Sequence, residues 1–532
     1  MSEKKQNKKN GTNNRKKGGS KKFRKAAAHF PMRMFICALL ILLELVVAVN
    51  LVFLLDEWFY FVSFLVVALG IAVVFNVINK DEPAAYKLPW GILLSILPVP
   101  GVIIYLIFGN PQQSRRVRKR FNQVNKEAAG YLVEQDGLHE KMVEACPDGA
   151  SLANYLSATT KMPPYENTSS EYFPSGEAFF DSLKNDLKTA KNYVFMEYFI
   201  ITPGKMWGEI YDILKQKIIE GVKVYVLYDD IGSMKKTPTD FDTRLRAEGF
   251  SAYKFNPITP IATTVHNNRD HRKITVIDGK IAYTGGVNIA DEYINEISLY
   301  GKWKDSAIKL TGEAVDSFVF MFTQLYNIFA REPIDPALFL ARHKTEKCDG
   351  FVQPYGDGPR PMDNDYTGKN LYLGIINAAK KYLYIATPYL IMGYEAEEAL
   401  CVAAKRGVDV IVMTPHVPDK KSVFIMTRSV YKKLIDAGVK VYEYGPGFIH
   451  SKIILADDSL GVIGTVNFDY RSFVHHYECG AFLVKTSSLL KIKKDYLNTV
   501  ESNGILQTPE SARLTLAEKL VKNVIGVIAP ML

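Results

Sequence analysis

The sequence predicts an α/β protein built from two equivalent lobes and preceded by transmembrane helices. Three observations predict this class: apolar runs of about 20 residues near the N-terminus, alternating strand-like and helix-like segments from about residue 146 onward, and one motif that recurs 179 residues later. We expect five regions: a basic disordered tail at 1–30, a membrane segment at 31–110, a basic juxtamembrane linker at 111–145, a first lobe at 146–345 and a second lobe at 346–532.

The positive charge of the chain is concentrated at its start. Residues 1–30 hold 11 of the 66 Lys and Arg residues but one of the 56 acids, so the net charge of +10 belongs mainly to this tail. The tail is either a solvated segment or an attachment to anionic lipid headgroups. A balanced remainder argues against nucleic acid as the partner. The five cysteines show no CxxC spacing, which excludes a disulfide framework and a zinc ribbon.

Three apolar runs, at 34–55, 58–77 and 88–108, have the length of a bilayer crossing. Cationic segments precede the first run and follow the third, whereas the turn between the first two is Asp56-Glu57. Because cationic flanks stay in the cytoplasm, the two flanks should lie on the same side, and three full spans do not satisfy this.

The third run is interrupted by Pro98-Val99-Pro100-Gly101, where proline breaks a helix. We therefore expect two spans plus a third segment that is re-entrant or interfacial. The alternative is three ordinary spans with an external catalytic part. In either case the chain is a multi-pass membrane protein.

A repeat organises the rest of the chain. Strand-like residues 193–198 and 222–228 flank an amphipathic helix at 206–221, and residues 383–389 and 408–413 flank a second helix in the same order. Self-similarity of this kind predicts a duplicated α/β domain, with helices on the faces of each sheet.

The two halves share the pattern His-x-Lys-(x)4-Asp-(x)6-Gly-x-x-Asn. Every internal spacing is equal in the two copies, which makes this the strongest functional signal in the chain. The first copy is His271, Lys273, Asp278, Gly285 and Asn288, and the second is His450, Lys452, Asp457, Gly464 and Asn467.

Strand geometry places the histidine and lysine of each copy on one face, because residues i and i+2 of a strand point the same way. Asp278-Gly279 predicts a hairpin turn after the first strand, and Asp is a favoured turn residue. If the halves meet about a pseudo-twofold axis, two imidazoles face each other in a cationic pocket. Such a pocket suits a phosphodiester: one histidine attacks phosphorus, and the other acts as acid and base. Four residues are expected to bind phosphate, namely Lys273, Asn288, Lys452 and Asn467. This chemistry needs no metal, and we expect no cofactor.

The paired motif resembles that of the phospholipase D superfamily, and segments around it are similar to the bacterial cardiolipin synthase branch. These segments are Asn268 to Lys273, Gly285 to Tyr293, Trp303 to Asp305, Asn467 to Phe473 and the closing Ile528 to Leu532. The resemblance implies a cardiolipin synthase that transfers a phosphatidyl group between two phosphatidylglycerol molecules, releasing glycerol. It implies two phospholipase D-like lobes in a bacterial membrane protein, with phosphatidylglycerol and anionic lipids as partners, and the cationic flanks predict that these lobes are cytoplasmic. The oligomeric state is left open.

The resemblance also implies residue roles. His271 is expected to be the nucleophile and His450 the acid and base, with Lys273, Asp278, Lys452 and Asp457 completing the catalytic motifs. For Asp278 and Asp457 the residues themselves favour a structural turn. Asp305 and Glu478 match the carboxylates that orient the histidines, and we expect each to serve the histidine of the other half. The hydroxyl of Thr465, which is Gly286 in the first copy, is a candidate phosphate contact.

Three other functions remain open at this point: a phospholipase D hydrolase, a phosphodiesterase acting on nucleic acid, and a lipid-binding scaffold without activity. His266, His475 and His476 are expected to be pocket lining or merely polar. The amphipathic residues 514–528 either lie on the membrane or complete the core, and we expect the latter.

Overall fold

The computed structural model describes residues 59–529, apart from 81, 110–114, 133, 258–266, 342, 344–347 and 361–364. The basic tail, the first apolar run at 34–55 and His266 therefore lie outside the described residues. The chain divides into two compact units, Met1–Gly109 and Asn110–Leu532.

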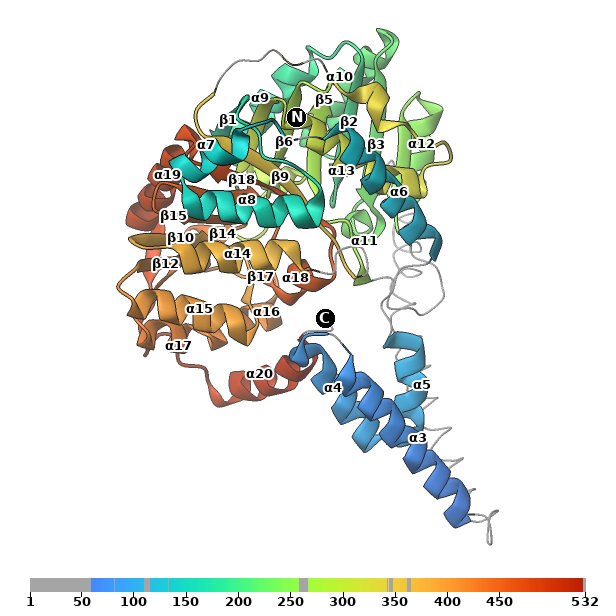
Figure 1. The fold of residues 1–532 in the computed structure, drawn as a ribbon, viewed down its shortest axis with the longest axis vertical. Coiled ribbons are helices and arrows are strands. Elements are labelled where there is room, and N and C mark those ends of the chain that lie inside the picture. Colours follow the sequence, from blue (N-terminus) through green and yellow to red (C-terminus); the bar gives the residue numbers. More distant parts are fainter. Residues whose placement is uncertain are drawn as a thin grey trace, which may run out of the picture. The chain divides into compact units, whose positions relative to one another are not determined.

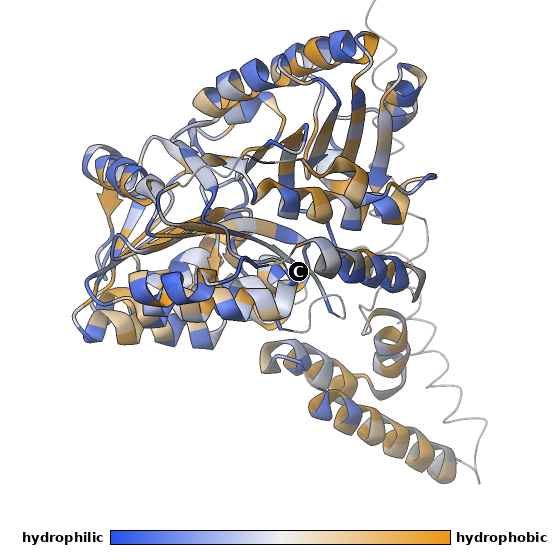
Figure 2. Ribbon diagram, turned by 45° about the horizontal axis from the view of Figure 1, so that its top comes forward, coloured by the Kyte–Doolittle hydropathy of each residue, from blue (hydrophilic) through white to orange (hydrophobic). Residues whose placement is uncertain are grey.

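The described part of the first unit is a set of three helices, α3 (Phe59–Asn79), α4 (Ala84–Ile96) and α5 (Pro98–Phe108). The helix is interrupted at Leu97, at the prolines that the sequence identifies as breakers. Trp90 of α4 packs edge-on against Tyr105 of α5, with ring centroids 5.2 Å apart. Figure 2 shows that these helices are apolar along much of their length. Among the described helices, none meets the length and hydropathy of a candidate membrane span.

Two large sheets form the frame of the second unit (Figure 1). The seven-stranded sheet has the order β1-β8-β6-β5-β2-β3-β4, and the eight-stranded sheet has the order β19-β13-β12-β10-β15-β16-β18-β9. The first sheet comprises β1 (Thr168–Phe173), β2 (Tyr193–Tyr198), β3 (Lys223–Asp229), β4 (Ser251–Phe255), β5 (Lys273–Ile277), β6 (Ile281–Gly285) and β8 (Ala307–Gly312). The second comprises β9 (Phe351–Asp357), β10 (Tyr382–Ala386), β12 (Asp409–Pro415), β13 (Lys440–Tyr444), β15 (Ile453–Ala456), β16 (Leu460–Gly464), β18 (Glu478–Val484) and β19 (Gly504–Leu506).

The strand order of the two sheets is the same, apart from the added edge strand β19. In both, two parallel neighbours on one side of the central strand are followed on the other side by an antiparallel hairpin, β5–β6 or β15–β16. The predicted α/β class with two sheet-containing lobes is therefore confirmed.

One hydrophobic core contains residues of both sheets together with α13 (Val315–Phe329) and α19 (Ser487–Asn503). Phe195 of β2 stacks on Phe322 of α13 at 4.2 Å between centroids, and Tyr384 of β10 stacks on Tyr496 of α19 at 5.2 Å. The same kind of aromatic contact thus joins strand and helix in each lobe, and the shared core holds the two lobes together.

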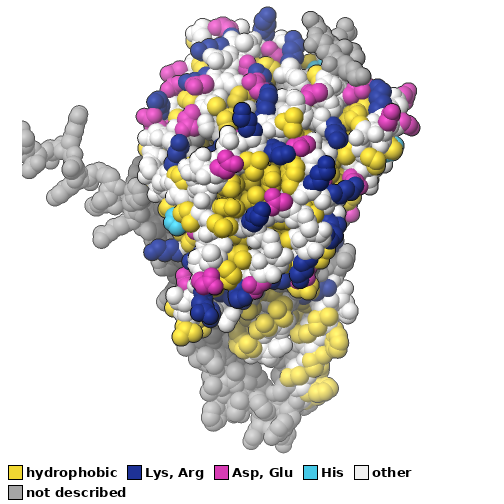
Figure 3. All heavy atoms as spheres, turned by 90° about the vertical axis from the view of Figure 1, so that its left-hand side faces the viewer, with side chains coloured by type: hydrophobic (Ala, Val, Ile, Leu, Met, Phe, Trp, Pro, Cys, Tyr) yellow, Lys and Arg dark blue, Asp and Glu magenta, His cyan; other side chains and the backbone are white. Residues whose placement is uncertain are grey.

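Amphipathic helices cover the outer faces of the sheets. α9 (Gly176–Leu187) and α10 (Lys205–Ile219) pack into the outer core of the first lobe, and α14 (Thr367–Ala378) and α15 (Tyr394–Lys405) into that of the second. In Figure 2 the helices alternate between polar and apolar positions while the strands are mostly apolar. Acidic and basic side chains are interspersed over the face in Figure 3, in line with the balanced charge after the tail.

Helices before the first sheet belong partly to the second lobe. Leu138, Met142 and Leu156, from α7 (Leu138–Ala145) and α8 (Pro147–Thr160), lie in the core that contains Phe351 and Tyr355. The sequence boundaries divide these helices between the linker and the first lobe, because a periodic apolar pattern shows that a helix is packed but not against which partner. The remaining elements are α6 (Arg115–Tyr131), α11 (Asp230–Ser233), α12 (Phe241–Ala247), η2 (Asp291–Ile294), β7 (Lys302–Lys304), η3 (Pro336–Phe339), β11 (Leu390–Ile391), α16 (Lys421–Ser429), α17 (Tyr431–Asp436), β14 (Gly447–Ile449), β17 (Phe468–Asp469), α18 (Tyr470–Val474) and α20 (Leu516–Ile528).

The last helix, α20, packs along α16 and begins at Thr515 with a complete capping box (Figure 1). Val521 and Ile525 are half-buried, whereas Leu516, Leu520 and Val524 are exposed. One side of the helix is thus partly covered, but none of the described residues of α20 belongs to a hydrophobic core, contrary to the expectation that this segment completes it.

Candidate active site

The two motif histidines lie where the lobes meet. The backbone N–H of His271 donates to the carbonyl of Tyr477 at 2.9 Å, and that of His450 donates to the carbonyl of Lys304 at 2.7 Å. Each histidine is thereby joined to the residue just before the orienting carboxylate of the other lobe. The parallel pairing of β14 with β7 and the bridge between Asp270 and Tyr477 hold these crossings in register.

The crossings fix which carboxylate meets which histidine. Nδ1 of His271 lies 2.9 Å from both carboxylate oxygens of Glu478, and Nδ1 of His450 lies 2.7 Å from Oδ2 of Asp305. Both carboxylates are completely buried. The expected crossed pairing is therefore confirmed. With Nδ1–H donating to a carboxylate, Nε2 of each ring is left to face a substrate.

Both imidazoles are held in the neutral form. Burial, followed by the charges of Lys273, His476, Lys452 and His450, lowers the pKa of His271 well below its usual value. Burial and Lys452 lower the pKa of His450 to about 4, against the opposing effect of Asp305. A neutral ring has a free nitrogen lone pair at pH 7, which a nucleophile requires.

The pKa values of the two orienting carboxylates are shifted in opposite directions. Burial raises the pKa of Glu478 well above its usual value, although Lys273 and the hydroxyl of Thr465 oppose this shift. Burial also raises the pKa of Asp305, but attraction to His450 and Lys452 outweighs it, so the net shift is downward. The two halves of the site are therefore electrostatically unequal despite their common fold.

The motif lysines lie beside the histidines and are buried. Nζ of Lys273 donates to the carbonyl of His271 at 2.6 Å, and Nζ of Lys452 donates to the carbonyl of His450. Burial lowers the pKa of Lys273 to about 8 and that of Lys452 to about 7. Below these pKa values, two buried ammonium groups beside two neutral imidazoles make a strongly anion-attracting site.

The motif asparagines are buried and differ in their contacts. Asn288 accepts from the N–H of Ile200 at 3.1 Å and donates to the hydroxyl of Tyr293 at 2.7 Å. Asn467 donates to Asp469 at 3.4 Å, and its buried Oδ1 has no hydrogen-bond partner. Asn288 is thus committed to positioning Tyr293, whose ring lies 5.4 Å from His450, whereas Asn467 has spare capacity for a ligand.

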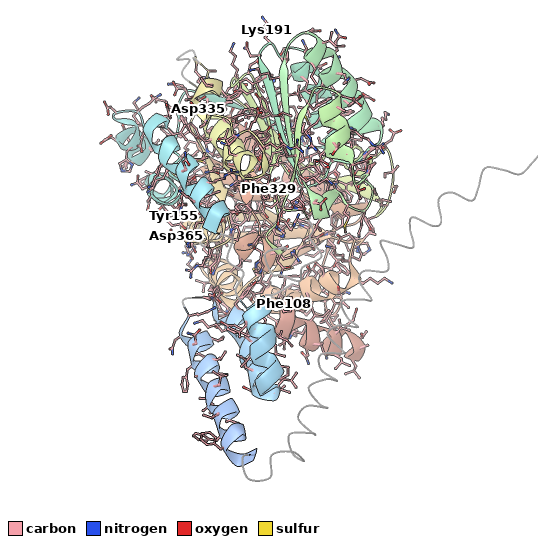
Figure 4. All side chains as sticks on the ribbon, turned by 90° about the vertical axis from the view of Figure 1, so that its right-hand side faces the viewer. Phe108, Tyr155, Lys191, Phe329, Asp335 and Asp365 are labelled. Atoms are coloured by element: carbon pink, nitrogen blue, oxygen red, sulfur yellow. The ribbon has the colours of Figure 1, made fainter. Side chains whose placement is uncertain are left out.

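Asp278 and Asp457, which the motif names with the catalytic residues, lie at hairpin turns and bind backbone N–H groups there, as their residue type favours. Both occupy hairpin turns with positive φ, 52° and 55°. The Asp278 carboxylate accepts three backbone N–H groups, from Lys191, Asn192 and Tyr193 at 2.7–2.9 Å, and Asp457 accepts the same three from 380–382. Lys191 marks the outer end of the first sheet in Figure 4. The turn lies roughly 20 Å along the strand from His271.

Replacing Asp278 by alanine should therefore lower stability and spare catalysis. Three charge-assisted hydrogen bonds are lost, so we expect about 2 kcal/mol lower free energy of unfolding and unchanged kcat per folded molecule. Chemical unfolding of the solubilised full chain measures the first, and Asp436→Ala is the control because Asp436 pairs with Lys432 only on the surface. A fall in kcat without a change in stability would contradict this assignment.

His476, which the sequence predicts to be either pocket lining or merely polar, lies beside His271. Its ring lies 5.3 Å from that of His271, and its Nδ1 is 3.5 Å from Glu478. Trp303 holds the equivalent place, two residues before Asp305, with its ring 5.3 Å from His450. The sequence does show that a ring lies two residues before the carboxylate in both halves. These positions are not part of the repeated His-x-Lys motif, so the motif does not identify them. One histidine thus contacts a polar ring and the other an apolar one.

Among the described residues, His271, His476 and Glu478 also form the one group with atoms spaced for a metal ion. The Nε of Arg471 donates to Nε2 of His476 at 3.2 Å, so the proton of this imidazole sits on Nδ1, which faces Glu478. Nδ1 therefore presents a proton rather than a lone pair to Glu478, 3.5 Å away, which does not suit a metal ligand.

Thr465 supports a carboxylate rather than a phosphate, contrary to expectation. Its hydroxyl donates to Glu478 and accepts from the N–H of Cys479 at 3.0 Å. At the equivalent Gly286, a Cβ atom would approach Oδ1 of Asp305 to 2.0 Å. Threonine at 465 thus provides a hydrogen bond to Glu478, whereas glycine at 286 leaves space for the carboxylate of Asp305.

Comparison with known proteins identifies the relatives of this chain. Residues 183–298 and 372–500 match the family described as "Cardiolipin synthase, PLD-like domain", and residues 68–110 match "Phospholipase_D-nuclease N-terminal". Cardiolipin synthase 2 of Bacillus cereus is 34% identical over 85% of this chain and 88% of its own length. The cardiolipin synthase of Alkalihalophilus pseudofirmus is 33% identical over 88% of this chain and 92% of its own.

Two further matches extend the comparison. An uncharacterised protein of Streptococcus mutans serotype c is 38% identical over 86% of this chain and 99% of its own length. The phosphatidylserine synthase structure from Haemophilus influenzae Rd KW20 superposes with a TM-score of 0.54 at 15% identity, covering 72% of this chain and all of that one. This last similarity concerns the fold alone.

Proposed function

The chain belongs to the cardiolipin synthase family with phospholipase D-like domains, and from this membership we propose that it joins two phosphatidylglycerol molecules into cardiolipin and glycerol. The observation that carries the proposal is the crossed pair of imidazole–carboxylate dyads where the lobes meet. Two oriented imidazoles supply the nucleophile and the acid–base group that a phosphatidyl transfer needs.

In the first step, Nε2 of His271 attacks the phosphorus of one phosphatidylglycerol. The bond from phosphorus to the glycerol oxygen breaks, and His450 delivers its proton to that oxygen, so glycerol leaves and the phosphatidyl group stays on His271. The anionic phosphodiester favours the imidazolium form of His450, which the empty site disfavours. The positive charge that develops on the His271 ring favours the carboxylate form of Glu478, which then accepts from Nδ1 and stabilises that charge.

In the second step, the neutral His450 removes a proton from a hydroxyl of the second phosphatidylglycerol. The resulting oxygen attacks phosphorus, the bond to His271 breaks, and both histidines return to their starting states. Lys273, Lys452 and Asn467 stabilise the charge on the non-bridging oxygens in both steps. Asn288, which we expected to share this role, acts through Tyr293 instead.

The products distinguish this function from hydrolysis. The full chain in vesicles of phosphatidylglycerol should yield cardiolipin and glycerol in equal amounts. Phosphatidic acid as the main product would mean that water resolves the intermediate, and the proposal would fail. Mass spectrometry of the lipids and an enzymatic glycerol assay give the two readouts.

The lysines should impose an alkaline limit on activity. Each is cationic below its pKa and neutral above it, so the free site loses positive charge as the pH rises through about 7 for Lys452 and about 8 for Lys273. We expect kcat/KM to fall about tenfold per pH unit between pH 7 and pH 8, where Lys452 loses its proton, and up to about a hundredfold per unit above pH 8, where both lysines do. In Lys452→Arg the absolute rate should drop while the decline near pH 7 disappears, because guanidinium stays charged. A kcat/KM that is flat from pH 7 to 9 would contradict this.

We further propose that the hydrophobic N-terminal segment anchors the enzyme in the bacterial cytoplasmic membrane, with the lobes at 146–345 and 346–532 on the cytoplasmic side. Exposed apolar side chains along α3, such as Phe64 and Phe75, support a lipid environment for this segment. Protease added outside right-side-out vesicles should spare the lobes, and cleavage there would favour an external catalytic part.

A further inference from the structure

The helix α20 carries an apolar stripe that nothing in the described structure covers. Leu516, Leu520 and Val524 recur every four residues and are 84%, 67% and 61% exposed. The stripe adjoins Val521 and Ile525, the half-buried side of the helix, so the apolar face of α20 is covered along one edge only. The helix is well defined, because Thr515 and Glu518 form a capping box at its start.

The charge around the stripe favours an anionic surface. Residues 420–428 and 516–528, which cover α16 and α20, carry five cations and one acid. The acid, Glu518, is engaged with Thr515 in the capping box. The cations are Lys420, Lys421, Arg428, Lys519 and Lys522. A helix with an apolar face and surrounding cations has the composition of one that lies in the headgroup region of an anionic bilayer.

The same helix pair connects to the catalytic centre. Nζ of Lys420, just before α16, lies 5.7 Å from the ring of Tyr389, whose hydroxyl donates to Asp419 at 2.6 Å. The Tyr389 ring is 6.4 Å from that of Phe448, which is 6.0 Å from His450. A chain of contacts therefore connects α20 to the acid–base histidine: α20 packs on α16, Lys420 before α16 lies at Tyr389, and Tyr389 reaches His450 through Phe448.

We propose that α20 is an interfacial helix that rests on an anionic lipid bilayer and positions the second lobe, with His450, against it. The inference rests on the proposed function, since a lipid substrate must pass from the bilayer into a buried site. Its role is separate from anchoring: it sets how readily bilayer phosphatidylglycerol reaches His450.

The test compares two substrates in the full chain reconstituted into phosphatidylglycerol vesicles. In Leu516→Ser/Leu520→Ser/Val524→Ser, the apparent KM for bilayer phosphatidylglycerol should rise about tenfold. The kinetics toward dihexanoyl-phosphatidylglycerol supplied from water should not change. Ile219→Ser/Leu338→Ser is the matched control, because these side chains are 76% and 78% exposed and lie on other elements. This control should leave both substrates unaffected.

A second measurement reports the position of the helix directly. In Leu520→Trp, brominated phosphatidylglycerol should quench the added tryptophan fluorescence, whereas an Ile219→Trp variant should not be quenched. An unquenched Leu520→Trp, or equal loss of activity on both substrates, would overturn the proposal and point to a second protein surface or a folding role. If the wild type makes no cardiolipin from either substrate, the proposed function fails while quenching still reports on α20.

Discussion

His450→Ala should abolish cardiolipin formation from phosphatidylglycerol and yet still form the covalent intermediate from a phosphatidyl ester of p-nitrophenol. His271→Ala should do neither. The physical reason is that glycerol leaves as a strongly basic alkoxide that needs a proton, whereas p-nitrophenolate leaves without one. We expect a loss of roughly 10⁴-fold with the natural substrate in both variants, since each removes a member of a reacting unit.

The measurement is a stopped assay with a substrate labelled at phosphorus. After acid-free denaturation, label bound to protein reports the phosphohistidine, and p-nitrophenolate release reports the first step. His139→Ala is the control for removal of an imidazole, because His139 lies on α7 outside the site. Label retained in His271→Ala but lost in His450→Ala would show that His450 is the nucleophile and His271 the acid–base group.

Asp305→Asn should behave like His450→Ala, and Glu478→Gln should behave like His271→Ala. An amide in place of the carboxylate no longer stabilises the imidazolium and favours the wrong tautomer, which we expect to cost roughly 10²- to 10⁴-fold in kcat. The p-nitrophenyl ester should rescue the first step in Asp305→Asn and not in Glu478→Gln.

This pattern tests the crossed geometry directly. Glu478 is separated from His271 by 207 positions and Asp305 from His450 by 145, so the pairing is a property of the fold. If Glu478→Gln were rescued and Asp305→Asn were not, each carboxylate would serve the histidine of its own half. Unfolding midpoints near that of the wild type would show that the variants retain the fold.

The repeat and the hairpins were predictable because they are local. Equal spacing in two copies and Asp-Gly or Asp-Asp turns specify where each strand reverses, and Asp278 and Asp457 fall at those turns. For these two aspartates, turn chemistry favoured a structural role, whereas the motif placed them with the histidines. Only the hydrogen bonds to 191–193 and 380–382 resolved the conflict.

The interior of the site was less predictable because it depends on contacts between distant segments. From the sequence alone, the hydroxyl of Thr465 could contact either phosphate or another side chain. Its position beside Glu478 in the fold shows that its partner is this carboxylate. His476 lies outside the motif spacing, and its role depends on Arg471 and Glu478. The packing of α8 in the second lobe is likewise invisible to periodicity.

The exchange of carboxylates between the lobes has a consequence for how such a chain arose and how it can be divided. A single repeat contains a catalytic histidine but not the carboxylate that orients it. An ancestral single-copy protein would therefore have had to function as a dimer. Cut between the repeats, the two pieces should be inert apart and regain turnover when mixed, as complementing fragments do.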